Sequence, residues 1–248
     1  MHELQPDIPK LVQASSFIFA GTVVELGTSS VANLPPRDNF AVIRIDRSLR
    51  SDPALGELRK RVVTVALRKR GELQPQQRAV FFTSDWIQGR GIAAREISHV
   101  DAQLEDDVDA NIKLLPQRHL ADRLSSSVLV IVAKVVAVKP TPFDVRWRNA
   151  PQWAIASFDI RNALRGRPTQ STTVLFPRSA RPTWALAPRL SDGQRGIFLL
   201  HRPPPWAPLP ESQQFLTSEA FTLLDPADVQ PESQRPLIEK LLGQVGAP

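Results

Sequence analysis

The chain has few side chains that could perform acid–base or metal chemistry. It contains four histidines and neither cysteine nor tyrosine, which excludes thiolate and phenolate chemistry. His99 has carboxylates close by in the sequence: Asp101, then the acidic run Glu105, Asp106, Asp107 and Asp109. Such a set could hold a hard cation, but its spacing matches no calcium-loop pattern, and an acidic solvated connector explains it equally well. We expect no metal there.

The other histidines lie in separate parts of the sequence. His2 is terminal, His119 belongs to a short helical stretch, and His201 follows a strand-like run. No serine stands in a nucleophile-elbow pattern, and no glycine-rich loop is present to cradle phosphate. We therefore expect a protein that is not an enzyme, without catalytic residues or a cofactor.

A grouping of arginine and tryptophan is the best candidate for a binding surface. It comes from two loops, RWRNAPQW at 146–153 and RSARPTWALAPR at 178–189. Arginine and aromatic rings can bind nucleic acid by neutralising phosphates and stacking on bases, and both are enriched at the centres of protein interfaces. Tryptophans in proline-rich loops also pack back onto their own domain. We predict a partner-binding surface formed by Arg146, Trp147, Arg148, Trp153, Arg181 and Trp184.

The elements that carry these loops occur twice in the chain. Four segments of the first half return in the same order in the second half, which predicts an internal duplication. The pairs are SFIFAGTVVEL (16–26) with VLVIVAKVVAV (128–138), FAVIRIDRSLRSDP (40–53) with IASFDIRNALRGRP (155–168), LQPQQRAVFF (73–82) with LSDGQRGIFL (190–199), and EISHVD (96–101) with AFTLLD (220–225).

Each copy contains five short segments typical of strands. They are apolar runs rich in Val, Ile and Phe, or they alternate apolar with polar residues, and turn signals separate them. Helical stretches precede the first strand and follow the fifth; we expect them to cover a barrel end, with Asp225 capping the last one. Closure into a barrel would remove the exposed edges of a five-stranded sheet. The expected strands are 16–26, 40–46, 62–67, 78–83 and 91–99, then 128–138, 155–161, 172–176, 195–201 and 215–224.

The order of these motifs resembles the netrin-like and tissue-inhibitor-of-metalloproteinase-like OB barrels, including their cysteine-free bacterial relatives. The resemblance covers both halves and is carried by Gly21, Gly166, Gln77, Arg78, Gln194 and Arg195. It implies a binding barrel without catalysis. The cysteines that anchor the inhibitory edge in the metalloproteinase inhibitors are absent, so protease inhibition is not carried over. We predict a mainly β chain of two tandem five-stranded OB-like β-barrels with short flanking helices, one over residues 1–105 and one with a C-terminal helix over residues 106–248.

Charge distinguishes the two halves. Residues 113–210 contain 15 Lys or Arg against 4 Asp or Glu, whereas the rest contains 16 against 21. A basic field attracts anionic partners such as nucleic acid or acidic protein surfaces, although a solvated arginine-rich face is also common. The longest apolar run is too short to span a bilayer, and the first residues do not resemble a secretory signal, so we expect a cytoplasmic protein without a membrane partner.

These observations favour a non-catalytic binding or adaptor protein, a subunit of a larger protein assembly that uses loops of the second barrel. The alternative is a single-stranded nucleic-acid-binding protein. The sequence does not specify the partner's identity or the oligomeric state.

Overall fold

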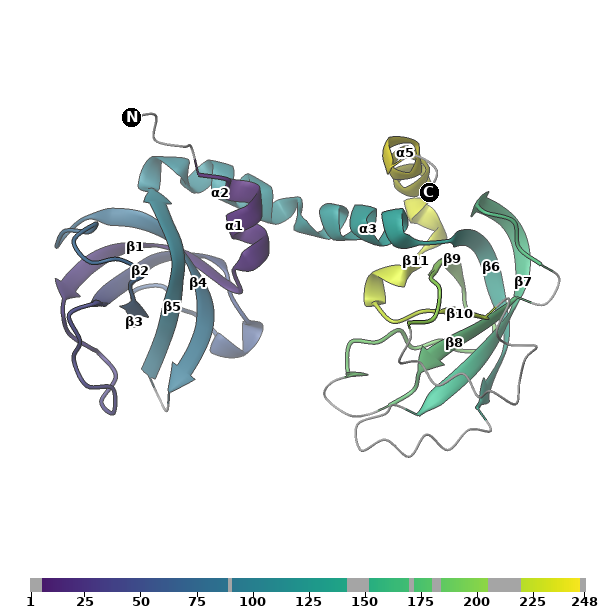
Figure 1. Cartoon of the computed structure of the whole chain (residues 1–248), viewed down its shortest axis with the longest axis horizontal. Coiled ribbons are helices and arrows are strands. Elements are labelled where there is room, and N and C mark those ends of the chain that lie inside the picture. The colour runs from purple at the N-terminus through teal and green to yellow at the C-terminus, as the bar shows by residue number, and fades with distance from the viewer. Residues whose placement is uncertain are drawn as a thin grey trace. The chain divides into compact units, whose positions relative to one another are not determined.

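The chain folds into two compact units. A computed structural model describes residues 6–88, 91–141, 152–169, 172–179, 184–204 and 220–245. Contacts within the chain group into a first unit, Met1–Leu115, and a second unit, Pro116–Pro248. The division falls after Leu115 rather than at residue 105, because helix α2 (Glu105–Lys113) packs onto the first unit through the buried Val108. Both units are mainly β, as predicted (Figure 1).

The first unit is a closed five-stranded barrel. Its strands pair in the order β1-β2-β3-β5-β4 and return to β1, and β3 and β5 form the parallel pair. Closure gives each strand two paired neighbours, which is how small β-domains limit edge-to-edge association. The strands are β1 (Phe17–Leu26), β2 (Phe40–Arg50), β3 (Val62–Ala66), β4 (Arg78–Gln88) and β5 (Gly91–Asp101).

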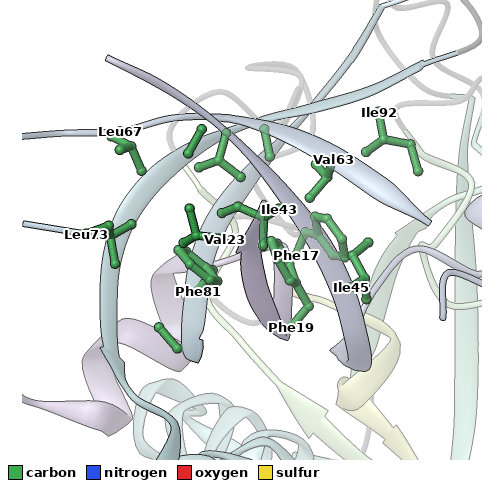
Figure 2. Close-up of a cluster of buried hydrophobic side chains, with 14 of the residues drawn as sticks. Phe17, Phe19, Val23, Ile43, Ile45, Val63, Leu67, Leu73, Phe81 and Ile92 are labelled. Atoms are coloured by element: carbon green, nitrogen blue, oxygen red, sulfur yellow. The ribbon is translucent and has the colours of Figure 1, made fainter. Parts of the chain in front are cut away.

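Alternation along the strands fills the barrel with side chains. Phe17 and Phe19 of β1 and Phe81 of β4 point into the interior, where the rings of Phe19 and Phe81 stack with centroids 5.3 Å apart. Figure 2 shows them beside Ile43 and Val63 from neighbouring strands. All five side chains are essentially inaccessible to solvent, so this interior provides a core for the first unit.

Two helices cover the outer face of β1 and β4. The residues that alternate with the core positions, Ile18 of β1 and Val80 of β4, contact Val12 of α1 (Ile8–Ala14) and Val108 of α2. The helices thus lie against the barrel wall, and the predicted position over a barrel end is wrong. The two strands carry apolar residues on both faces because both faces are buried.

The second unit contains a six-stranded sheet in the order β10-β8-β7-β6-β9-β11. Without β11, this is the strand order of the first unit opened between its fourth and fifth strands. Among the described residues, one antiparallel bridge, His201 to Thr222, joins the ends of β9 and β10. The strands are β6 (Leu129–Pro140), β7 (Trp153–Arg165), β8 (Thr173–Pro177), β9 (Arg195–Leu200), β10 (Ala220–Thr222) and β11 (Val229–Gln230).

Helices α3 (Leu115–Ser126) and α5 (Arg235–Val245) cover the outer face of β6 and β9, as α1 and α2 do in the first unit. Leu120 and Leu124 of α3 and Ile238 and Leu241 of α5 are buried there. Asp225 is a cap, but of the 3₁₀ turn Pro226–Asp228 and not of α5, which begins only at Arg235. A short β11 and a second 3₁₀ turn, Glu232–Gln234, separate that cap from α5.

The two units share local irregularities as well as strand order. The pairing of β1 with β2 shifts register at Ile18/Phe19, Ala20/Gly21 and Val23/Glu25. The pairing of β6 with β7 shifts at the three corresponding places, Val130/Ile131, Val132/Ala133 and Val135/Ala137. Each third shift leaves one valine, Val24 or Val136, as the extra residue of a bulge, which re-aims its strand.

The turn before β4 also recurs before β9. The side chain of Gln77 accepts a hydrogen bond from the backbone N–H of Gln74 at 2.9 Å, and the side chain of Gln194 accepts one from Ser191 at 3.1 Å. The preceding residues, Gln76 and Gly193, both have positive φ, of 67° and 83°. The glutamines of the predicted motif therefore hold a turn rather than a ligand.

Candidate functional site

The structure places two of the six residues of the predicted binding surface. Trp153 begins β7 and is only 4% exposed, packed against Leu175. Trp184 is half-buried, with its ring centroid 6.4 Å from that of Trp153 and the planes tilted by 57°. Arg146, Trp147, Arg148 and Arg181 lie outside the described residues. Of the two placed tryptophans, Trp153 supports the surface from beneath, and Trp184 is the one that solvent reaches.

A turn after Trp184 presents an apolar side chain to solvent. The N–H of Ala187 donates to the carbonyl of Trp184 at 3.1 Å, and between them Leu186 is 80% exposed. Ala187 and Leu190 are buried again, which anchors the far end of the segment. We call residues 184–190 the tryptophan loop. An exposed leucine alone would be ordinary, but one next to an accessible tryptophan provides an apolar patch.

Arginines border the tryptophan loop. Arg189 donates through Nη2 to the carbonyl of Ser179 at 2.6 Å, which ties the loop to the segment after β8. Arg178, next to Ser179, is exposed, and its backbone N–H donates to the carbonyl of Gln152 just before Trp153. An apolar centre with a basic border has the composition of a protein interface more than that of a catalytic pocket.

A second polar cluster joins α3, the end of β9 and the 3₁₀ turn after β10. Arg123 donates to both oxygens of Asp228, at 2.7 and 2.8 Å, and His201 lies with Nε2 3.0 Å from Oδ1. The backbone N–H groups of Leu224 and Asp225 donate to Oδ2. Asp228 is fully buried, and its oxygens are occupied by these donors. Its role is to fasten the C-terminal segment to the sheet.

The cluster sets the charge state of Asp228. Burial alone would raise the pKa of this carboxyl, but the hydrogen bonds from His201 and Arg123 outweigh it and hold the pKa below its usual value. The other nitrogen of His201, Nδ1, lies 3.2 Å from the carbonyl oxygen of Ser126 and 3.4 Å from its hydroxyl. That hydroxyl also donates to the carbonyls of Asp122 and Arg123, so it caps the end of α3 instead of being prepared for nucleophilic attack.

His99 belongs to a site that the sequence reasoning missed. Its Nδ1 lies 2.5 Å from Oε1 of Glu96, whose side chain is 2% exposed. The pairing of β4 with β5 shifts register between Phe82 and Thr83, so Ile97 is an extra residue in β5. Residues three apart in a regular strand point to opposite faces, and this bulge is what brings Glu96 and His99 together. No signal in a single sequence reveals that bulge.

The acidic residues first grouped with His99 have other partners. Asp101 accepts from the N–H of Gln103 at 2.8 Å and caps a 3₁₀ turn, Ala102–Leu104. Glu105 binds Arg47 at 3.1 Å and Arg78 at 2.6 Å, so α2 is tied to the barrel wall. Asp109 also binds Arg47, at 3.3 Å. Among the described side chains, no group of three or more His, Asp or Glu could hold a metal ion.

No protein-family model matches this chain, and no curated protein matches it significantly. The site must therefore be interpreted from its own geometry. None of the helices in the described ranges is long and apolar enough to cross a bilayer.

Proposed function

We propose that the chain is a non-catalytic binding or adaptor protein, a subunit of a larger protein assembly, that contacts a protein partner through the tryptophan loop of its second unit. The observation that carries the proposal is the exposed Leu186 beside Trp184, supported from below by the buried Trp153. Aromatic and apolar anchors with an arginine border are the residues that dominate binding energy at protein interfaces.

The fold part of the proposal is that both units are OB-like barrels derived from one duplicated ancestor. The shared strand order, the three shared register shifts and the shared glutamine turn support a common origin. The bridge from His201 to Thr222 stands where β9 and β10 would pair if the second barrel closed like the first. The likeness to netrin-like barrels remains a prediction.

An affinity pull-down from the native host, followed by mass spectrometry, tests the functional proposal. Trp184→Ala combined with Leu186→Asp should remove the partner captured by the unaltered chain, because truncating an interface anchor costs about 2 kcal/mol or more. Val24→Asp is the matched control, since Val24 is an exposed apolar residue, 41% accessible, of the other unit. The proposal fails if the double variant retains the partner.

Single-stranded nucleic acid is the rival partner, and the basic charge of residues 113–210 favours it. Fluorescence anisotropy with labelled oligonucleotides over a salt series separates the two. Binding dominated by phosphate contacts weakens steeply as salt rises, whereas binding to an apolar patch changes little. Trp147→Ala with Arg148→Ala tests the arginine and tryptophan positions outside the described residues in the same assays.

A further inference from the structure

The first unit contains a polar pocket at the point where β3 stops pairing with β5. The last pair of that parallel ladder is Ala66 with Arg95, and beyond it the backbone N–H of Arg68 donates to the side chain of Glu96 in β5. The opening is a pocket of about 260 Å³. It is lined by Arg68, Lys69, Glu72, Glu96, Ile97, Ser98 and His99.

Glu96 forms the buried wall of this pocket and has no free oxygen. Its Oε2 accepts a hydrogen bond from the backbone N–H of Arg68 at 2.6 Å, and its Oε1 accepts one from Nδ1 of His99. This contact keeps the proton of the imidazole on Nδ1. His99 is held further by the core ring of Phe81, with centroids 6.1 Å apart, and its side chain is 18% exposed. Within the described part of the chain, no hydrogen bond engages its other nitrogen, Nε2.

The other charged side chains that line the pocket are Arg68, Lys69 and Glu72. Lys69 and Glu72 form an ion pair, with Nζ 3.1 Å from Oε1. The exposed guanidinium of Arg68 forms no ion pair with any described residue. The groups available to an incoming molecule are therefore the Arg68 guanidinium, which donates to negatively charged oxygen, and Nε2 of His99, which does so when the imidazole is protonated.

The corresponding place in the second unit carries no such pair. In the repeat, EISHVD aligns with AFTLLD, so Glu96 corresponds to Ala220 and His99 to Leu223. Ala220 is 8% exposed and Leu223 is fully buried in the core of its unit. The aspartates that end the two segments, Asp101 and Asp225, both cap a 3₁₀ turn through a 2.8 Å hydrogen bond, which supports the alignment.

We propose that this pocket is a binding site for a small anion carrying a carboxylate or phosphate group, held by His99 Nε2–H and the Arg68 guanidinium. A buried charged pair is commonly replaced by apolar residues without loss of stability, and the second unit carries such a replacement. A bound anion gives the pair of the first unit a role beyond the hydrogen bond that Glu96 accepts from the backbone of Arg68. This site is independent of the tryptophan loop and does not rest on its proposed partner.

The anion should bind more weakly as pH rises. The hydrogen bond to Glu96 is the main cause that raises the pKa of His99, desolvation opposes it, and Glu72 adds to the increase. The charged groups facing His99 are Glu96 on β5 and Arg68, Lys69 and Glu72 on the segment after β3. Below that pKa, Nε2 carries a proton and donates; above it, Nε2 is an acceptor and repels an anion.

NMR titration of the full chain with inorganic phosphate, and separately with acetate, tests the proposal, with ionic strength matched by sodium chloride. The ring signals of His99 should shift with saturation for the favoured anion, and those of His119 and His201 should not. His99→Gln should weaken binding about tenfold, the consequence of losing one charge-assisted hydrogen bond. Arg68→Ala, which alters an exposed side chain and leaves the backbone N–H in place, should weaken it similarly.

The double variant Glu96→Ala with His99→Leu copies the second unit. It should stay folded and bind the anion about tenfold more weakly, as His99→Gln does, while Lys10→Ala, which removes an exposed cation far from the pocket in sequence, should bind as the unaltered chain does. The proposal is overturned if neither anion shifts the His99 signals below neutral pH, or if the double variant binds as well as the unaltered chain. If only one anion binds, that result identifies the ligand group.

Discussion

The two units have the same strand order, but they differ in how their sheets close and in which functional features they carry. In the first unit β4 and β5 pair over their whole length, and the barrel closes. In the second, β11 occupies part of the edge of β9, and the described residues of β9 and β10 meet at one bridge. Shared bulges and turns belong to the fold; the polar pocket and the tryptophan loop each belong to one unit.

Removing a core ring from either unit should have the largest effect. Phe81 and Phe198 occupy corresponding positions in β4 and β9 and are fully buried. Phe81→Ala and Phe198→Ala should each lower the free energy of unfolding of their own unit by about 3–5 kcal/mol, because each leaves a cavity that the neighbouring side chains cannot fill. Hydrogen exchange measured by mass spectrometry should show lost protection in the altered unit alone. Loss of protection in both units by one variant would contradict two separate cores.

Asp228 gives the second unit an acid-sensitive fastening that is fully buried, whereas Glu105 and Asp109 of the first unit form their ion pairs nearer the surface. Asp228→Asn should cost about 3 kcal/mol, since it breaks a buried pair and leaves Arg123 without its carboxylate. Because the folded pKa is lowered, the stabilisation is present above the ordinary value of 3.8 and is lost as pH falls through the folded pKa. Urea denaturation at several pH values measures it. The exposed Asp122→Asn is the control and should change little.

The glutamine turns should behave alike in the two units. Gln77→Ala and Gln194→Ala each remove one side-chain hydrogen bond to a turn backbone, which is worth about 1 kcal/mol. Equal losses of stability, measured as equal shifts in the denaturant midpoint of the two units, would support a shared turn. A large loss in one unit and none in the other would break the equivalence.

The smallest expected effect is the pH dependence that His99 adds to the stability of the first unit. Its folded pKa is raised, so its stabilisation is fully present below the unfolded value of 6.5 and is lost as pH rises through the folded pKa. The stability difference between the unaltered chain and His99→Gln should therefore shrink across that window. Hydrogen exchange of β5 at increasing pH, corrected for intrinsic rates, is the measurement.

Repetition and alternation in the sequence sufficed to predict β1 to β9 and their order of occurrence. They did not predict β11, and residues 215–219 of the last expected strand lie outside the described residues, which place Ala220–Thr222 in β10. Repetition and alternation could not predict how the sheets close, because closure depends on pairings between distant segments, such as β3 with β5. Helix placement was also missed: Ile18 and Val80 were seen to be apolar, but apolarity alone does not say what covers the outward face. The His99 site depends on a single bulged residue, Ile97, which leaves no trace in composition or periodicity.

Cross-strand nuclear Overhauser effects in the full chain test the claim of a repeated fold most directly. If the units are copies, Val24 and Val136 will both lack a partner on the neighbouring strand, while Val23 faces Ile43 and Val135 faces Phe158. Regular pairing through one valine and a bulge at the other would show that the two halves reached similar sheets by different registers, and the account of a duplicated unit with divergent sites would be wrong.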